Sequence, residues 1–416
     1  MKRSTLLSLD AFAKTEEDVR VRTKAGGLIT LSCILTTLFL LVNEWRLFNS
    51  VVTRPQLVVD RDRHAKLELN VDVTFPSVPC DLVNLDIMDD SGELQLDILD
   101  AGFTMTRLDR EGNPVGDAAE LHVGGNGEDA TPANDDPNYC GPCYGSKDQS
   151  QNDNLAQADK VCCQDCDAVR SAYLESGWAF FDGKNIEQCE REGYVNRINE
   201  HLHEGCRIKG SAQINRIQGN IHFAPGKPFQ TVHGHFHDTS LYDKTSDLNF
   251  NHIINHLSFG KPIQSHHKLL TNNKRHGDAA VAATSPLDGR QVFPDRTTHL
   301  HQFSYFAKIV PTRYEYLDSE VIETAQFSAT YHSRPLVGGR DQDHPNTIHT
   351  RGGISGLFVF FEMSPLKVIN KEQHGQSWSG FILNCITSIG GVLAVGTVMD
   401  KLLYKAQRSI WGKKSQ

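Results

Sequence analysis

Two long uncharged stretches, one near each end of the sequence, constrain this chain more than any other feature. Eighteen residues without a charge, AGGLITLSCILTTLFLLV, lie between Lys24 and Asn43. As a helix they would be about 27 Å long, which matches the hydrocarbon core of an early secretory membrane. A second apolar run extends from Trp378 to Met399, and Trp378 lies where an interfacial aromatic residue is expected. We therefore predict a membrane protein with two transmembrane helices.

A buried core helix is the alternative for either run, and a cleaved signal peptide is a further alternative for the first. Apolar runs of this length seldom occur in soluble domains, and Asn43-Glu44-Trp45-Arg46 does not match an A-x-A-like cleavage site. Basic residues are more numerous after the second run than just before it, which favours cytosolic termini. The predicted segments are a cytosolic segment 1–24, a transmembrane helix 25–45, a lumenal domain 46–376, a transmembrane helix 377–400 and a cytosolic tail 401–416.

Composition and motifs argue against several functional classes. The net charge of −9 disfavours a nucleic-acid binder, which usually presents a basic surface. No nucleophile elbow, phosphate-binding glycine loop or H-E-x-x-H helix occurs in the sequence. We therefore predict no catalytic residue and no cofactor, and expect a protein that is not an enzyme.

The cysteines indicate the compartment of the central region. Cys33 and Cys385 fall inside the apolar runs, and the even number that remains is expected to form disulfides in an oxidising lumen. Seven of these eight lie between 140 and 206, which predicts a cysteine-rich insertion with an undetermined pairing. The disulfide candidates are Cys80, Cys140, Cys143, Cys162, Cys163, Cys166, Cys189 and Cys206.

Two other uses of these cysteines remain open. Cys140-Gly-Pro-Cys143 has the form of a thioredoxin-type redox pair, although it lies in a polar segment rather than at a helix start after a buried strand. The same pair with Cys163 and Cys166 has the C-x2-C…C-x2-C spacing of a structural zinc site. The predicted lumenal location and the additional cysteines favour disulfides over both.

The central region reads as a mainly-β domain. Lys66–Phe75 alternates apolar and polar residues, which is typical of a half-buried strand. Separate runs of this kind predict an antiparallel β-sandwich, whereas 161–205 predicts a helical insertion broken near Asp182-Gly183. The other strand-like runs are Leu94–Leu99, Ala212–Phe223, Phe303–Val310, Val321–Tyr331 and Gly356–Ile369, with a turn at Ala224-Pro-Gly226.

Histidine is the abundant reactive residue type, at 19 residues. In His233-Gly-His-Phe-His237, a strand would project all three imidazoles to one face, as a metal site needs, but only Asp238 offers a further ligand nearby. Because histidine titrates near pH 6.5, these and other histidines are also candidates for sensing pH between the endoplasmic reticulum and the Golgi apparatus. Ordinary solvated or core histidines are the alternative, and no metal site is predicted. The pH-sensing candidates are His233, His235, His237, His252 and His256.

The sequence ends Gly-Lys413-Lys414-Ser-Gln, with lysines at the fourth and third positions from the end. This is the dilysine pattern that the retrograde vesicle coat binds, and it functions only in the cytosol. The alternative is that the lysines only fix the orientation of the second span.

The whole chain closely resembles the ER-vesicle and ER–Golgi intermediate compartment protein family, and in particular the larger subunit of its heteromeric retrograde cargo receptor. The matching segments are Leu7-Ser-Leu-Asp-Ala-Phe12, Val195-Asn-Arg-Ile-Asn, Ile214-Asn-Arg-Ile-Gln-Gly-Asn-Ile-His-Phe-Ala-Pro-Gly226, Leu248-Asn-Phe-Asn-His-Ile-Ile-Asn-His-Leu-Ser-Phe-Gly260, Phe303-Ser-Tyr-Phe-Ala-Lys-Ile-Val-Pro-Thr312, Phe361-Glu-Met-Ser-Pro-Leu366 and Ile389-Gly-Gly391.

The resemblance implies a lumenal β-sandwich, cycling between the endoplasmic reticulum and the Golgi apparatus in coated vesicles, and a hetero-oligomer with a smaller paralogous subunit. It also implies retrieval of ER-resident cargo proteins that lack a C-terminal tetrapeptide signal. The family's ER-exit motif corresponds here to Leu402-Leu403-Tyr404, where an aromatic pair is more typical. The competing hypotheses are a lumenal thiol oxidoreductase that uses Cys140 and Cys143, and a structural subunit without receptor function.

Overall fold

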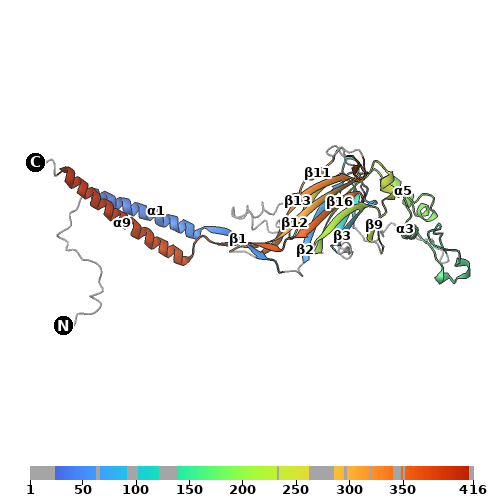
Figure 1. Ribbon diagram of the computed structural model, residues 1–416, viewed down its shortest axis with the longest axis horizontal. Coiled ribbons are helices and arrows are strands. Elements are labelled where there is room, and N and C mark those ends of the chain that lie inside the picture. Colours follow the sequence, from blue (N-terminus) through green and yellow to red (C-terminus); the bar gives the residue numbers. More distant parts are fainter. Residues whose placement is uncertain are drawn as a thin grey trace, which may run out of the picture. The chain divides into compact units, whose positions relative to one another are not determined.

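The computed structural model describes residues 24–61, 66–90, 102–120, 139–231, 234–261, 285–294, 298–317, 321–340, 348–349 and 352–411. The predicted strand Leu94–Leu99, together with His233, Lys413 and Lys414, lies outside these residues. The chain divides into two compact units, a pair of long helices and a β-rich domain (Figure 1).

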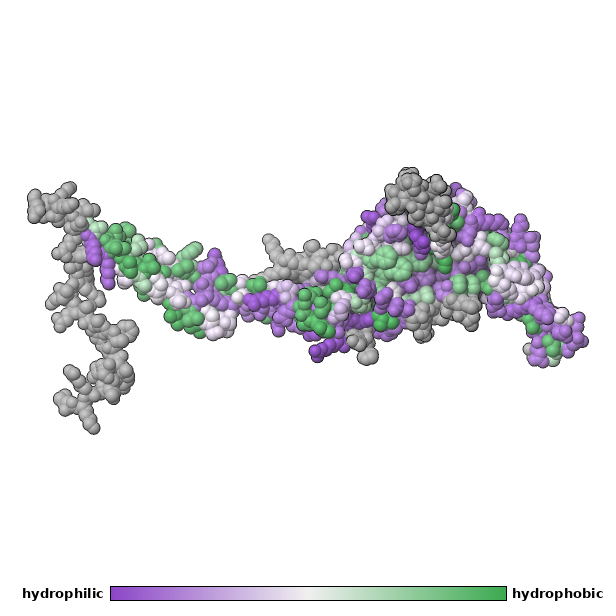
Figure 2. Space-filling model, in the orientation of Figure 1, coloured by the Kyte–Doolittle hydropathy of each residue, from purple (hydrophilic) through white to green (hydrophobic). Residues whose placement is uncertain are grey.

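Both apolar runs are helical, as predicted. They form α1 (Lys24–Asn49) and α9 (Trp378–Trp411), and the second helix therefore continues beyond the predicted span into the predicted tail. Of the most apolar 18-residue windows, 0% of the first and 6% of the second is buried, which argues against the core-helix alternative. Figure 2 shows hydrophobic side chains along the surface of this pair. Both helices thus present the apolar exterior that a bilayer requires.

The helices α1 and α9 lie side by side and run antiparallel. Near one end of the pair the Asn384 side chain donates to Glu44 (3.3 Å), and further along the Cys33 thiol lies 3.9 Å from the Val392 carbonyl oxygen. Gly396 faces Cys33 so closely that an added Cβ would lie 2.6 Å from its Sγ atom, whereas Gly390 has open space. The close approach is therefore made at Gly396.

The β-rich domain contains two large sheets. Sheet A has the order β1-β17-β12-β16-β7-β3, with β13 paired to β12, and sheet B has the order β11-β10-β2-β6-β4-β5. Sheet A consists of β1 (Val51–Val59), β3 (Val83–Asp89), β7 (Gly219–Pro225), β12 (His301–Glu315), β13 (Ile322–Pro335), β16 (Gly356–Met363) and β17 (Leu366–His374). Sheet B consists of β2 (Lys66–Phe75), β4 (Phe103–Leu108), β5 (Pro114–Glu120), β6 (Gly205–Asn215), β10 (His252–Phe259) and β11 (Arg290–Val292).

Two small two-stranded sheets accompany them. One pairs β8 (Pro228–Thr231) with β9 (Gly234–His237), and the other pairs β14 (Gly339–Arg340) with β15 (Ile348–His349). A short helix, α6 (Ser240–Lys244), follows β9. The hairpin β8-β9 is the element that completes the site described below.

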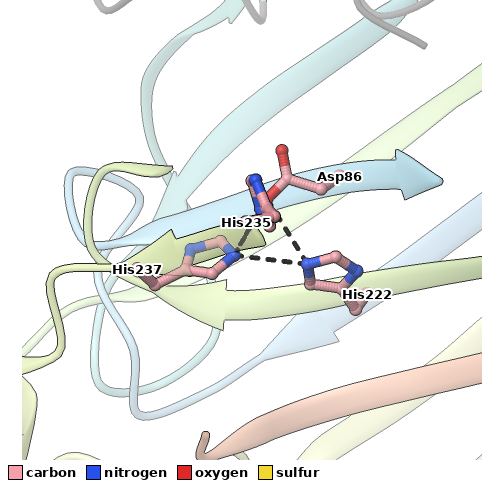
Figure 3. A group of neighbouring side chains, drawn as sticks. All are labelled: Asp86, His222, His235 and His237. Carbon is pink, nitrogen blue, oxygen red and sulfur yellow. Dashed lines mark hydrogen bonds and ion pairs between the residues drawn. The ribbon is translucent and has the colours of Figure 1, made fainter. Parts of the chain in front are cut away.

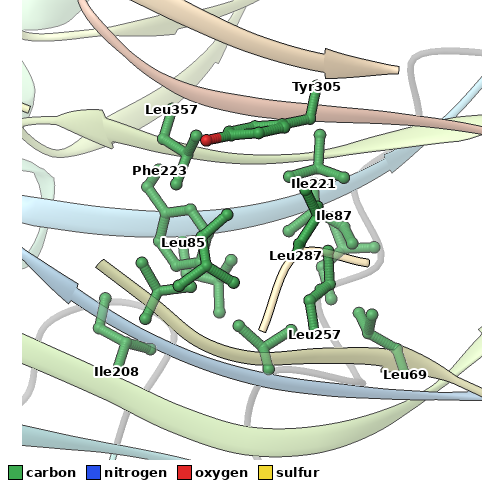
Figure 4. Packing of buried hydrophobic residues seen from close by; sticks show 14 of the residues in the cluster. Leu69, Leu85, Ile87, Ile208, Ile221, Phe223, Leu257, Leu287, Tyr305 and Leu357 are labelled. Atoms are coloured by element: carbon green, nitrogen blue, oxygen red, sulfur yellow. The ribbon is translucent and has the colours of Figure 1, made fainter. Parts of the chain in front are cut away.

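The core lies between the facing sides of sheets A and B. Figure 4 shows Leu69, Ile208 and Leu257 of sheet B packed with Leu85 and Ile221 of sheet A, all of them at most 2% exposed. The predicted strand Lys66–Phe75 is β2, and every second residue points into this core. The sandwich prediction is thereby confirmed, with the hydrophobic alternation as its physical cause.

Two predicted strand runs are each divided in the structure. The run 212–223 spans β6 and β7, because the chain crosses from sheet B to sheet A at 216–218 and the apolar alternation continues on both sides. The run 356–369 breaks between β16 and β17 at Ser364-Pro365, where proline lacks the donor that a ladder needs. The pairing of β12 with β16 is parallel, so the sandwich is not antiparallel throughout.

The predicted helical insertion contains α3 (Cys166–Glu175), α4 (Glu187–Arg191) and α5 (Tyr194–His201), preceded by the short 3-10 turns η3 (Asn152–Asn154) and η4 (Gln157–Asp159). It has a small core of its own around Val169, Phe180 and Ile186. The disulfides are Cys80–Cys206, Cys140–Cys162, Cys143–Cys163 and Cys166–Cys189. The prediction that all seven clustered cysteines belong to the insertion is wrong for Cys206, which lies in β6 and pairs with Cys80 of the sandwich.

Candidate functional site

The hairpin β8-β9 begins at a tight turn. Gly226 has φ +81°, and a Cβ there would lie 1.8 Å from the Asp238 carbonyl oxygen, so only glycine fits. On β9, His235 and His237 project to one face, with their Nε2 atoms 3.0 Å apart, as strand periodicity predicts. Phe236 between them stacks on Phe229 of β8. The turn thus folds two imidazoles back toward sheet A.

Sheet A supplies two further polar side chains at the same place. Asp86 of β3 lies directly opposite His222 of β7 in the antiparallel register. Their sequence neighbours Leu85, Ile87 and Ile221 point into the core, so Asp86 and His222 lie on the outer face of the sheet.

Four donor atoms converge between sheet and hairpin (Figure 3). The Nε2 atom of His237 lies 3.2 Å from that of His222 and 3.2 Å from Asp86 Oδ2. Asp86 Oδ2 is also 3.4 Å from His235 Nε2 and 3.6 Å from His222 Nε2. The side chains are 0–6% exposed, so the cluster is buried. We call Asp86, His222, His235 and His237 the histidine cluster.

The outer nitrogens of two imidazoles have partners of their own. His222 Nδ1 lies 2.8 Å from the Asn220 side-chain oxygen, and His237 Nδ1 lies 3.4 Å from the Gly226 carbonyl oxygen. Because both partners are acceptors, each Nδ1 carries a proton, and each Nε2 atom faces the cluster. His235 Nδ1 is buried without a hydrogen-bond partner among the described residues.

Burial and charge determine the protonation of the cluster. Burial lowers the pKa of His222 to about 4 against the opposing effect of Asp86, so this ring is neutral at lumenal pH. Burial alone would raise the pKa of Asp86, but hydrogen bonds and charge from His235 and His237 outweigh it and hold that pKa well below its usual range. The carboxylate is therefore ionised.

An aromatic ring closes one side of the cluster. Phe358 of β16 is the cross-strand partner of His222, and their rings stack with centroids 5.3 Å apart. The cluster is therefore a buried site with three imidazoles and one carboxylate. Among the described residues it is the group of histidine, cysteine, aspartate and glutamate side chains that is spaced to hold a metal ion.

The other residues considered from the sequence lie elsewhere. Asp238 accepts from Ser240 and lies near Arg170, so it does not join the cluster. His252 is fully buried and contacts the Tyr305 hydroxyl at 3.0 Å. His256 is half-exposed and pairs with Asp288 at 2.8 Å. The pH-sensing prediction for these histidines stays a prediction.

Asp86 and His222 were missed because each is a single polar residue between two apolar ones in a strand. That pattern normally marks a solvent-facing side chain. Only the pairing of β3 with β7 and the cover by hairpin β8-β9 reveal that they are buried together, and neither can be read from local sequence.

The cysteine geometry contradicts both alternatives to structural disulfides. Cys140 and Cys143 are bonded to Cys162 and Cys163, so they form neither a redox pair with each other nor a tetrathiolate zinc site. Gly141 between them is required by packing, because a Cβ would lie 2.0 Å from the Cys163 carbonyl oxygen. The C-G-P-C sequence therefore reflects two adjacent disulfides.

The predicted sorting signals are only partly described. Leu402 and Leu403 are exposed at 62% and 41% and lie within α9, which also contains Tyr404. Lys413 and Lys414 lie outside the described residues. Both signals stay predictions.

Comparisons with known proteins give consistent matches. Residues 143–400 match the family model described as "Endoplasmic reticulum vesicle transporter", and residues 6–96 match that of the "Endoplasmic Reticulum-Golgi Intermediate Compartment (ERGIC)".

Relatives match along nearly the whole chain. The ER-derived vesicles protein ERV46 of Saccharomyces cerevisiae is 88% identical over 416 residues, which is 100% of both chains. A probable endoplasmic reticulum-Golgi intermediate compartment protein 3 of Dictyostelium discoideum is 34% identical, over 99% of this chain and 97% of its own. The yeast ER-derived vesicles protein ERV41 is 23% identical, over 98% and 94% of the two chains.

The two apolar helices and the disulfide-bonded β-sandwich are consistent with the family that these matches indicate. The chain belongs to the family of ER-vesicle and ER–Golgi intermediate compartment membrane proteins, which act in transport between these compartments.

Proposed function

We propose that this protein is a sorting receptor that cycles between the endoplasmic reticulum and the Golgi apparatus and retrieves escaped ER-resident proteins. The β-sandwich with its insertion would bind cargo in the lumen, and the cytosolic segments would bind vesicle coats. The observation that carries the proposal is full-length similarity to an ER-vesicle protein, combined with two helices whose surfaces suit a bilayer. A chain of this kind can connect cargo binding in the lumen to coat binding in the cytosol.

The proposal includes a smaller paralogous subunit as partner. Saccharomyces cerevisiae contains both ERV46 and ERV41, and each matches at least 98% of this chain. The similarity of ERV41 to nearly the whole chain supports a related membrane protein as the partner. Co-purification of the tagged full-length chain from native membranes tests this partner directly.

The coat-binding step is tested by Lys413→Ala with Lys414→Ala. If these lysines bind the retrograde coat, the double variant accumulates in the Golgi apparatus or beyond and ER-resident proteins appear in the medium. Fluorescence microscopy and immunoblots of secreted ER residents measure the two effects.

Lys401→Ala with Lys405→Ala is the matched control, because it removes two positive charges from exposed residues of α9 in the same predicted cytosolic tail. The control variant should keep the normal distribution. Normal retention of ER residents in the Lys413 and Lys414 double variant contradicts the receptor proposal and favours a structural subunit.

A further inference from the structure

We propose that Asp86, His222, His235 and His237 bind one Zn²⁺ ion through Asp86 Oδ2 and the three imidazole Nε2 atoms. The inference concerns the β-sandwich alone and does not depend on the receptor function. It is argued from the spacing, burial and placement of the four ligand atoms.

The spacing of the donor atoms is that of a tetrahedral zinc site. With Zn–N bonds of 2.0–2.1 Å, the edges of a tetrahedron are about 3.3–3.4 Å long. Five of the six distances between these atoms range from 3.0 to 3.6 Å, and the sixth joins the Nε2 atoms of His222 and His235. All donor atoms of the cluster lie within 4.8 Å of one another. A single ion at their centre would contact all four.

The orientation of the side chains turns their ligand atoms toward one another. The outer nitrogens of His222 and His237 face the Asn220 side-chain oxygen and the Gly226 carbonyl oxygen, so their Nε2 atoms face the centre of the cluster. These two Nε2 atoms lie 3.2 Å apart, and His237 Nε2 lies 3.2 Å from Asp86 Oδ2 in a buried site. Buried polar atoms need partners, and one metal ion would be a common partner for all four side chains.

The outer contacts are those that a metal site uses. A metal-bound imidazole usually donates its second N–H to a carbonyl or carboxylate oxygen, which fixes the tautomer and the orientation of the ring. Asn220 and Gly226 occupy these positions, and the Asn84 side chain donates to Asp86 Oδ2 at 2.8 Å. The Phe358 ring on His222 excludes water from one side.

The donor set selects zinc among common metals. Imidazole and one carboxylate oxygen in tetrahedral arrangement suit Zn²⁺, whereas Cu²⁺ and Ni²⁺ favour tetragonal geometry and Ca²⁺ and Mg²⁺ require six or more oxygen ligands. The protein supplies all four ligands, so no position remains for a reactive water molecule. The site is therefore structural rather than catalytic.

Such an ion would fasten the hairpin β8-β9 to sheet A. The hairpin forms a separate two-stranded sheet, and an isolated hairpin of this size is marginally stable in water. Zinc would join β9 to β3 and β7 through their side chains, where the described residues form no backbone ladder.

The test uses the full-length protein purified in detergent without chelators, with its metal content measured by mass spectrometry. We expect about one zinc ion per chain. Exchange of zinc for Co²⁺ should produce the intense visible absorption of tetrahedral cobalt, and blocking the thiols of Cys33 and Cys385 should leave it unchanged. Absence of bound zinc together with absence of stoichiometric Co²⁺ binding overturns the proposal. A different metal on these ligands overturns the assignment to zinc.

Three substitutions identify the ligands. Asp86→Asn and His235→Gln each remove one donor with little change in size, and each should lower the zinc affinity by more than about 100-fold. His256→Gln is the matched control, because His256 lies outside the cluster on β10. Metal binding that is unchanged in the first two variants overturns the proposal.

A readout on the unsubstituted protein covers the case in which these variants do not fold. Removal of zinc with a chelator should lower the midpoint of thermal unfolding and increase hydrogen exchange in β9, and added zinc should reverse both. Hydrogen exchange in β9 that is insensitive to zinc contradicts the role of the ion in fastening the hairpin.

Discussion

Two acceptor groups outside the histidine cluster determine which nitrogen of two of its imidazoles faces the centre of the cluster. Asn220 fixes the tautomer of His222, and the Gly226 carbonyl oxygen does the same for His237. The first contact accounts for the polar residue at position 220, which lies on the same face of β7 as His222. The residue-scale prediction follows from the first contact.

Asn220→Ala should lower the zinc affinity by about 10–100-fold while leaving the stoichiometry unchanged, because the ring of His222 loses its orienting acceptor. Competition with a chromophoric chelator measures the affinity. Asn70→Ala is the control, because Asn70 lies in sheet B and contacts the Gly260 carbonyl oxygen. Equal affinities of the two variants would contradict the orienting role of Asn220.

The sequence predicted core residues better than site residues. The alternation in Lys66–Phe75 correctly placed Leu69, Val71 and Phe75 in the core, because burial of one strand face is a local property. The sequence also singled out His235 and His237, as candidates for sensing pH, but neither Asp86 nor His222. Their role depends on which strands are neighbours, and non-local pairing leaves no mark on a single polar residue.

At the scale of elements, the close contact of α1 with α9 depends on one glycine. Gly396→Cys would place a thiol next to Cys33, so mild oxidation of membranes should form a disulfide between the helices. Gly390→Cys is the control, because Gly390 faces open space.

The cross-link can be read without ambiguity because the four native disulfides all lie between Cys80 and Cys206. A protease site introduced between β10 and β11 allows the chain to be cut into one fragment that contains α1 and another that contains α9. The two fragments separate on a denaturing gel unless a disulfide joins Cys33 to residue 396. Equal cross-linking of both variants contradicts the observed helix interface. The existence of both helices followed from apolar length alone, but their contacting faces did not.

At the scale of the whole molecule, the sandwich and the insertion are stabilised differently. The sandwich buries a large apolar core and contains one disulfide, whereas the insertion buries few apolar side chains and contains three. Disulfides that close loops of about 20 residues contribute roughly 3 kcal/mol each, mainly by restricting the unfolded chain. The insertion therefore depends on its covalent links.

Mild reduction should increase hydrogen exchange throughout the insertion, including α3 and α4, while the strands of sheets A and B stay protected. Mass spectrometry of exchanged peptides measures this difference. The double variant Cys80→Ser with Cys206→Ser should instead leave the insertion protected, because its own disulfides remain. If reduction increased hydrogen exchange in the insertion and in sheets A and B at the same time, the two regions would not be stabilised separately. The sequence indicated an insertion held together by disulfides. Its end before Gly205 became clear only from the structure, in which Cys206 pairs with Cys80 of the sandwich.

The pairing of β1 with β17 has a consequence for biosynthesis. The first strand after α1 neighbours the last strand before α9, so β1 emerges from the ribosome roughly 300 residues before its partner. Contacts between such distant segments form late, because a long loop must close first. Only three residues separate the end of β17 at His374 from the start of α9 at Trp378. Sheet A is therefore completed only when translation reaches α9, and until then β1 has no neighbouring strand with which to pair.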